Sequence, residues 1–195
     1  AFYNRGLSKD EMEDSYGAIS DYSKAIAING KHKNAFIYRG YAKSDIGDHE
    51  GAIKDLTSAI EIDPEDPFGY NGRGYVKEKA GDYYAAISDY SKAIKIDPEN
   101  DYSYSGRAYA KWMIGDKNGA TNDFTKAIQL NPDEAYAFFG RGVIHKSEGN
   151  FKQACEDWII ASDMGYEIAK TRADECKNTD VVKESILNLL STQNY

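Results

Sequence analysis

Residues 36–47, FIYRGYAKSDIG, place an arginine and a glycine in the middle of an amphipathic helical pattern. The arginine recurs every 34 residues along the chain, and a glycine or, in one case, an alanine follows it. A period of this length indicates a repeat protein, in which each copy forms one supersecondary unit and neighbouring copies stack. The recurring arginines are Arg5, Arg39, Arg73, Arg107 and Arg141.

Other positions of the chain repeat in register with the arginines. An aromatic residue stands three positions before each arginine, alanines stand 13 and 20 positions after it, and a large aromatic or aliphatic residue lies between the alanines. Three copies end in the prolines Pro64, Pro98 and Pro132. This pattern resembles the tetratricopeptide repeat over roughly residues 1–166, although that family usually has leucine at the arginine position. The resemblance implies an all-α fold, a right-handed superhelical solenoid of antiparallel helix pairs with C-terminal capping helices.

The apolar spacing within one copy agrees with paired helices. Ala52, Ile53, Leu56, Ala59 and Ile60 form one apolar stripe of a helix. A glycine–aspartate break separates this helix from the preceding one, and the proline at the end of the copy prevents it from continuing. A single helix pair cannot bury its apolar face, so we expect neighbouring pairs to stack.

We expect five repeats, at approximately 1–34, 35–68, 69–102, 103–136 and 137–166, followed by capping helices over 167–195. One capping helix is predicted over 167–177, and a last one begins near Thr179 or Asp180, either of which provides an N-cap. The last helix covers the exposed end of the fifth repeat or docks on a second copy or another protein. Its apolar stripe consists of Val182, Ile186, Leu189 and Leu190.

An aspartate stands sixteen residues after every arginine. Arg39 lies eight residues before the turn at Gly47 and Asp55 lies eight residues after it, so the two are level in an antiparallel hairpin. We predict that each pair bridges the two helices of one repeat, and we disfavour a ladder of ligand-binding arginines because the partner charge lies within the repeat. The alternative partner of each aspartate is the arginine of the following repeat. The predicted structural pairs are Arg5–Asp21, Arg39–Asp55, Arg73–Asp89, Arg107–Asp123 and Arg141–Asp157.

The resemblance also implies a ligand site, because the first helices of tetratricopeptide repeats line a concave groove that binds peptides. Tyr41, Tyr75 and Tyr109 form a row at 34-residue spacing, and Trp112 follows Tyr109 by about one turn. Tyrosine and tryptophan are enriched in binding hot spots because they combine a large contact area with one polar group. The alternative is that these rings pack between neighbouring first helices. The predicted groove residues are Tyr3, Tyr41, Asn71, Tyr75, Tyr109, Trp112 and Phe139.

Charge restricts the class of partner. The 195 residues include 24 basic and 32 acidic ones, a net charge of −8, which disfavours nucleic acid. Acidic residues beside the tyrosine row, such as Asp45 and Glu78, suit a protein or peptide partner with basic and apolar side chains. One subfamily grips the C-terminal carboxylate of chaperones with a clamp that includes lysine and arginine. The corresponding positions here hold no cation: Tyr3, Leu7, Tyr38, Phe68 and Gly72.

Signs of catalysis, cofactors and membrane insertion are missing from the sequence. His32, His49 and His145 share no metal-ligand spacing, and no serine or cysteine stands in the setting of a nucleophile. We therefore expect no enzyme activity, no cofactor and no metal. No run approaches the ~20 apolar residues of a membrane span, so we expect no membrane insertion.

Localisation and thiol state stay open at this level. The start of the chain lacks a signal-peptide core, which favours the cytoplasm, but it begins with alanine, so a removed leader and export stay open. Cys155 and Cys176 form no metal motif. Unpaired buried thiols are expected in a reducing compartment, whereas a disulfide requires the capping helix to fold back on the fifth repeat.

These observations predict a non-catalytic scaffold or adaptor that binds a peptide or protein segment in the concave groove. The alternative is a structural or regulatory segment of a larger multidomain protein that associates with itself through the C-terminal helix. The oligomeric state is accordingly a monomer or a weak homodimer. The partner itself cannot be identified from the sequence, because one fold hosts many functions.

Overall fold

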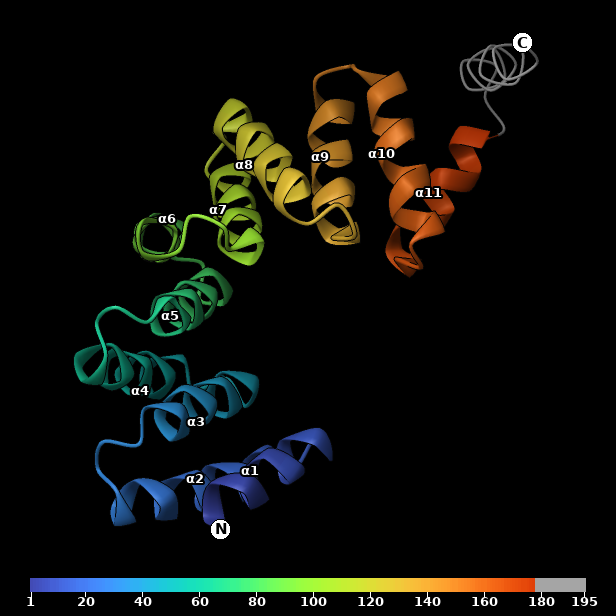
Figure 1. Ribbon diagram of the computed structural model, residues 1–195. Helices are drawn as coiled ribbons and strands as arrows, with labels where there is room; N and C mark the ends of the chain where they lie inside the picture. The colour runs from blue at the N-terminus through green and yellow to red at the C-terminus, as the bar shows by residue number, and fades with distance from the viewer. Residues whose placement is uncertain (178–195) are drawn as a thin grey trace. The chain divides into compact units, whose positions relative to one another are not determined.

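The chain is an all-α solenoid of helix pairs, of which the computed structural model describes residues 1–177 (Figure 1). It divides into two compact units, Ala1–Ala110 and Lys111–Tyr195, with the boundary inside α7. The first unit contains α1 to α6 and most of α7, and the second contains the end of α7 and α8 to α11. The helices are α1 (Phe2–Glu11), α2 (Ser15–Ile28), α3 (Lys33–Asp45), α4 (His49–Ile62), α5 (Pro67–Lys79), α6 (Tyr83–Ile96), α7 (Asp101–Met113), α8 (Lys117–Leu130), α9 (Ala135–Ser147), α10 (Phe151–Asp163) and α11 (Glu167–Lys177).

The second helix of each of the first four pairs begins at an aspartate. Each side chain accepts a hydrogen bond from the backbone N–H three residues on, which satisfies a donor of the first helical turn that has no partner within the helix. The capping aspartates are Asp14, Asp48, Asp82 and Asp116.

The turns between the two helices of each pair use left-handed backbone. Gly47, Gly81, Gly115 and Gly149 have φ between 81° and 85°, a region that residues with a Cβ rarely adopt. The first repeat has Glu13 at this position with φ 60°, and no other non-glycine residue among residues 1–177 has a positive φ. The turn therefore forms in the first repeat without its glycine, at the energetic cost of a left-handed side chain.

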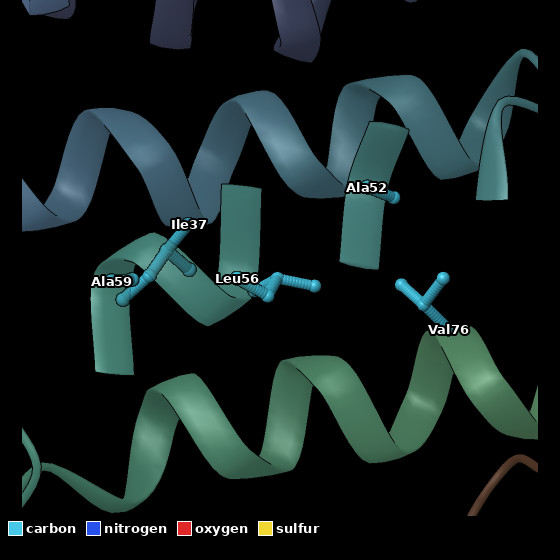
Figure 2. Close-up of a cluster of buried hydrophobic side chains, with 5 residues drawn as sticks. All are labelled: Ile37, Ala52, Leu56, Ala59 and Val76. Carbon is cyan, nitrogen blue, oxygen red and sulfur yellow. The ribbon is translucent and has the colours of Figure 1, made fainter. Parts of the chain in front are cut away.

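Leu56 of α4 lies at the centre of a buried cluster in the first unit. It is fully buried together with Ala52 and Ala59 of the same helix. Ile37 of α3 and Val76 of α5 point toward this row (Figure 2). Burying a leucine or valine side chain contributes about 1.5–3 kcal/mol. Because Val76 belongs to the following pair, α4 is packed both within its own pair and against the next one.

Glycines of the first helices mark close helix contacts. A Cβ on Gly40 would lie 2.9 Å from Cγ of Leu56, and a Cβ on Gly106 would lie 2.4 Å from Cζ of Tyr90. Both distances are too short for a normal contact, so the large side chains of α4 and α6 pack directly on the backbone of the neighbouring first helices.

The recurring aspartates are buried and hold the arginines sixteen residues before them. Arg39 donates from Nε and Nη2 to the two carboxylate oxygens of Asp55, at 2.8 and 2.7 Å. Arg107 and Asp123 lie in different units, so that pairing stays a prediction. The same bidentate geometry is found in Arg5–Asp21, Arg73–Asp89 and Arg141–Asp157.

A second cation reaches the same aspartates. Nζ of Lys43, four residues after the arginine, lies 2.8 Å from Asp55. In the last of these sites His145 replaces the lysine, with Nε2 4.0 Å from Asp157. The hydrogen bonds from Arg5 hold the pKa of Asp21 well below its ordinary value, so the carboxylate stays ionised in the folded chain.

The arginines also contact the preceding repeat. Nη1 of Arg39 donates to Oγ of Ser23 and Nη1 of Arg73 donates to Oγ1 of Thr57, both at 3.0 Å. The arginine of each following repeat thus contacts the hydroxyl of the serine or threonine that stands two positions after the aspartate. Ser91 and Thr125 bind Arg107 and Arg141 in the same way. Each of these arginines therefore joins its own first helix to the second helix of the repeat before it.

We predict that replacing one member of an arginine–aspartate pair is worse than replacing both. Arg73→Leu should lower the free energy of unfolding by about 3 kcal/mol, because Asp89 stays buried with less compensation. The double variant Arg73→Leu/Asp89→Leu should lose less, as measured by urea unfolding. The control is Arg5→Leu. The Arg5 side chain is 56% exposed and that of Arg73 only 19% exposed, so Arg5→Leu should lower the free energy of unfolding by less than Arg73→Leu does. A double variant less stable than the single one would contradict the pairing.

In the second unit, α11 packs against α10 and buries Ala169 and Ala173. Cys155 of α10 and Cys176 of α11 form a disulfide. The thiol state that the sequence left open is therefore the disulfide, because the helix at 167–177 folds back and brings the two cysteines together. The predicted last helix, in 179–195, lies outside the described residues.

We predict that the disulfide stabilises the second unit by restricting the unfolded chain. It closes a loop with a sequence separation of 21 residues, for which a contribution of about 3 kcal/mol is expected. Addition of a reductant should lower the free energy of unfolding of the wild type but not of Cys155→Ser/Cys176→Ser, measured by urea titration. Equal responses of both proteins to the reductant would show that the disulfide contributes nothing.

Candidate functional site

The first helices of the first unit form a continuous surface, because α3 contacts both α1 and α5. Aromatic side chains gather on this surface. We call the part that carries Tyr38, Tyr41, Phe68, Tyr75 and Tyr102 the aromatic face. Three of these residues have well-exposed side chains for their type: Phe68 is 63%, Tyr102 45% and Tyr38 38% exposed.

The rings of the aromatic face contact one another. Tyr41 lies edge-on to Tyr38 and to Tyr75, with 6.3 Å between ring centroids in both cases. Burial raises the pKa of Tyr41 to about 12, so its hydroxyl stays protonated at neutral pH. Tyr41 and Tyr75 remain partly exposed. The two rings thus pack against one another between α3 and α5, and their role in lining a groove stays a prediction.

Two hollows adjoin on the aromatic face and share Tyr41 and Phe68 as walls. The first hollow has a volume of about 230 Å³ and the second of about 300 Å³. Both combine aromatic walls with a few polar groups, the usual composition of a ligand site. The first hollow is lined by Asn34, Ile37, Tyr38, Tyr41, Asp66 and Phe68, and the second by Tyr41, Phe68, Asn71, Asn100 and Tyr102.

Ser103 fixes the asparagines of the second hollow. Asn71 is only 4% exposed, and its Oδ1 lies 2.7 Å from Oγ of Ser103. Oδ1 of Asn100 accepts a hydrogen bond from the backbone N–H of Ser103 at 3.0 Å. The amide planes of both asparagines are thereby held by the first turn of α7.

The carboxyl group of Glu78 lies on α5 one turn beyond Tyr75. The hydroxyl of Tyr90 donates to its Oε2 at 3.1 Å. Burial raises the pKa of Glu78 to about 7, even though this hydrogen bond and the nearby Lys79 act in the opposite direction. Asp10 of α1 accepts the hydroxyl of Tyr22 in a similar way, and burial raises the pKa of Asp10 too.

The remaining predicted groove residues are spread over both units. Tyr3 of α1 lies beside Tyr38, with ring centroids 5.9 Å apart. Tyr109 of α7 lies beside Tyr83 of α6, with ring centroids 6.5 Å apart. Trp112 lies in the second unit under Nζ of Lys117, which is 5.8 Å from its ring centroid.

Phe139, also in the second unit, is covered from α11. The guanidinium of Arg172 lies 4.8 Å from its ring centroid, and the ring of Tyr166 lies 5.3 Å away. The structure thus brings together Tyr3, Tyr41, Asn71 and Tyr75 on the first unit, whereas Phe139 packs beneath the capping helix.

Three residues of the aromatic face, Tyr38, Phe68 and Tyr102, are absent from the predicted groove set. A sequence signal for two of them exists, because Phe68, Tyr102 and Tyr136 recur at 34-residue spacing. These positions lie in the first turns of α5, α7 and α9.

Two further hollows, of about 370 and 340 Å³, lie at equivalent places of successive repeats. Phe36 and Ile62 line one of them, and Tyr70 and Ile96, which are 34 residues further on, line the other. No group of side chains among residues 1–177 is suited to hold a metal ion. Within the same residues, no helix has the length and apolar character that crossing a bilayer requires.

Comparison with known proteins agrees with this architecture. Models of the tetratricopeptide repeat match residues 36–66 and 67–100, which are the second and third helix pairs. The chain is a tetratricopeptide repeat protein. No curated protein matches it. Tetratricopeptide repeat proteins are generally non-catalytic scaffolds for protein–protein interaction, so the fold implies a protein or peptide partner.

Solved structures share the fold of this tetratricopeptide repeat protein at low sequence identity. A tetratricopeptide repeat protein from Parabacteroides merdae is 23% identical, with a TM-score of 0.73 over 91% of this chain and 70% of that one. A thermophilic protein of the same family from Thermus thermophilus is 14% identical, with a TM-score of 0.75 over 91% and 98%. YrrB, described as having an unusual peptide-binding site, is 17% identical, with a TM-score of 0.66 over 89% and 90%.

We predict that Glu78 makes the stability of the repeat array depend on pH. Its pKa is raised from 4.5 to about 7, so between these values the folded chain binds a proton that the unfolded chain has lost. The free energy of unfolding therefore falls as pH rises through this window, by on the order of 2 kcal/mol. Urea unfolding at pH 5 and pH 8 should show this fall in the wild type and not in Glu78→Gln.

The control for this measurement is Glu61→Gln, which removes an exposed carboxylate of α4. That variant should keep the pH dependence of the wild type. Parallel pH profiles of the wild type and Glu78→Gln would contradict the prediction.

Proposed function

We propose that this tetratricopeptide repeat protein is a non-catalytic adaptor that binds an extended peptide or protein segment on the aromatic face. The observation that carries this proposal is the pair of adjoining hollows around Phe68, which are lined by residues of the first helices and of the turns before them, and by none of the second helices. An aromatic side chain that is 63% exposed between two hollows offers contact area on both of its faces.

The chemistry of this surface suits a partner with apolar and basic side chains. Tyrosine and phenylalanine provide apolar area and ring faces that attract cations. The net charge of −8 favours encounter with a basic segment. Asp66, in the first hollow, already forms an ion pair with Nζ of Lys33, so its negative charge is largely neutralised within the protein.

The alternative function, self-association of a larger protein through the C-terminal helix, depends on residues 179–195. It stays a prediction, and so does the choice between a monomer and a weak homodimer. The mass of the full chain in solution at high concentration tests self-association and distinguishes a monomer from a homodimer.

We predict that Phe68→Ala/Tyr102→Ala weakens capture of the partner by at least about tenfold, because both side chains line the second hollow. Captured proteins would be quantified in pull-downs from a lysate of the source cells, with the immobilised full chain as bait. The matched control is Tyr16→Ala/Tyr84→Ala, which removes two aromatic side chains that are 75% and 73% exposed on second helices. Equal loss with both double variants, or no loss with either, would contradict binding at the aromatic face.

A further inference from the structure

One stripe of α5 carries three different kinds of binding group. Asn71, Tyr75 and Glu78 stand at positions i, i+4 and i+7, so their side chains lie on the same face of the helix. Seven residues of helix span about 10 Å. An amide, an aromatic ring and a carboxyl group thus follow one another along this stripe.

Asn71 offers an unused polar atom at one end of this stripe. Ser103 has a single hydroxyl proton, and its Oγ lies 2.7 Å from Oδ1 of Asn71 and 2.9 Å from Oδ1 of Asn100. Whether Ser103 donates that proton to Asn71 or to Asn100, only one of the two polar atoms of the Asn71 amide faces Ser103. The other atom has no hydrogen-bond partner among residues 1–177 and belongs to a side chain that lines the second hollow. A peptide N–H or C=O group would satisfy it.

Glu78 offers a carboxylate at the other end. Its Oε2 accepts the hydroxyl of Tyr90, and its second oxygen has no hydrogen-bond partner among the described residues. The charge of Glu78 reaches the hydroxyls of Tyr102 and Tyr109 on α7, where it adds to the effect of burial in raising the pKa of both. Tyr75 precedes it on α5. The carboxylate therefore lies among tyrosines from three helices, α5, α6 and α7.

The charged group that acts on Glu78 from its own helix is Lys79. Nζ of Lys79 lies 5.0 Å from the ring centroid of Tyr75 and 3.8 Å from Oδ1 of Asp45 of α3, and its side chain is 41% exposed. The tyrosine surface therefore already binds one ammonium group of the protein itself. A carboxylate with a free oxygen beside tyrosine rings suits a second such group, because both attract a cation.

We propose that the second hollow and Glu78 form a two-part subsite for an extended peptide that carries a bulky apolar side chain and, about three residues away, a lysine or arginine. The apolar side chain enters the hollow between Tyr41, Phe68 and Tyr102, the peptide backbone meets Asn71, and the cation pairs with Glu78. The spacing follows because an extended chain advances about 3.3 Å per residue, so three residues cover the length of the stripe. This inference rests on the function proposed above and specifies its ligand.

The experiment uses the full chain and synthetic nine-residue peptides with blocked ends. Each peptide carries one leucine and one lysine in a glycine–serine background, at separations of one to five residues, and has a partner peptide with norleucine in place of lysine. Binding is measured by fluorescence anisotropy at pH 8 and pH 6. The variants are Glu78→Gln, Phe68→Ala and, as matched control, Asp10→Asn, which removes the other carboxylate held by a core tyrosine.

At pH 8 the lysine peptide should bind about tenfold more tightly than the norleucine peptide, with the largest ratio at a separation of three. The ratio should shrink at pH 6, because the pKa of Glu78 is about 7 and the carboxyl group then carries a proton. Glu78→Gln should bind the lysine and norleucine peptides equally at both pH values, and Asp10→Asn should keep the preference of the wild type for lysine. Phe68→Ala should bind both peptides more weakly.

A lysine preference that survives Glu78→Gln, or that disappears equally in Asp10→Asn, overturns the inference. Equal binding of lysine and norleucine peptides that still requires Phe68 also overturns it, while the proposed binding at the aromatic face then stands. Absence of binding by every peptide overturns this ligand class, and the pull-down with the Phe68→Ala/Tyr102→Ala variant then decides separately on the proposed function.

Discussion

The bidentate contact between arginine and a buried aspartate is the constraint around which the described helix pairs are arranged. In the second repeat, Arg39 and Asp55 set α3 and α4 in register, and the third guanidinium nitrogen of Arg39 reaches Ser23 of the preceding pair. A planar group with fixed donor directions is suited to join three helices in one geometry. Within the first unit each first helix is thereby oriented on the pair before it, and the aromatic face inherits its shape from that orientation.

Much of this scaffold can be predicted from the sequence because it is periodic. The helix pairs follow from apolar spacing, and the level positions of Arg39 and Asp55 follow from the turn at Gly47. The hydroxyl at Ser23 also recurs every 34 residues, but helix periodicity alone does not reveal which hydroxyl lies near the next arginine. The disulfide cannot be predicted from the sequence for a related reason. It depends on α11 folding back on α10, and this tertiary contact leaves no local pattern in the sequence.

The candidate site is harder to predict than the scaffold, because it depends on departures from the repeat. Tyr41 and Tyr75 stand out as a periodic row, whereas the hollows exist because Phe68 and Tyr102 project from the first turns of α5 and α7. Asn71 and Glu78 have no equivalents of the same type in the neighbouring repeat, where Ile37 and Ser44 stand instead. Their significance emerges only when burial and hydrogen-bond partners are known.

The exposure of the arginine–aspartate contacts also indicates which helix pair of the first unit opens most readily. Arg5 binds Asp21 of its own pair, and its side chain is 56% exposed, against 17% for Arg39. In a stacked array each pair depends on its direct neighbours, and the pair whose contacts are most exposed to solvent opens first. Amide protons of α1 and α2 would therefore exchange with solvent earlier than those of α4, while α3, α5 and α7 keep the two hollows of the aromatic face.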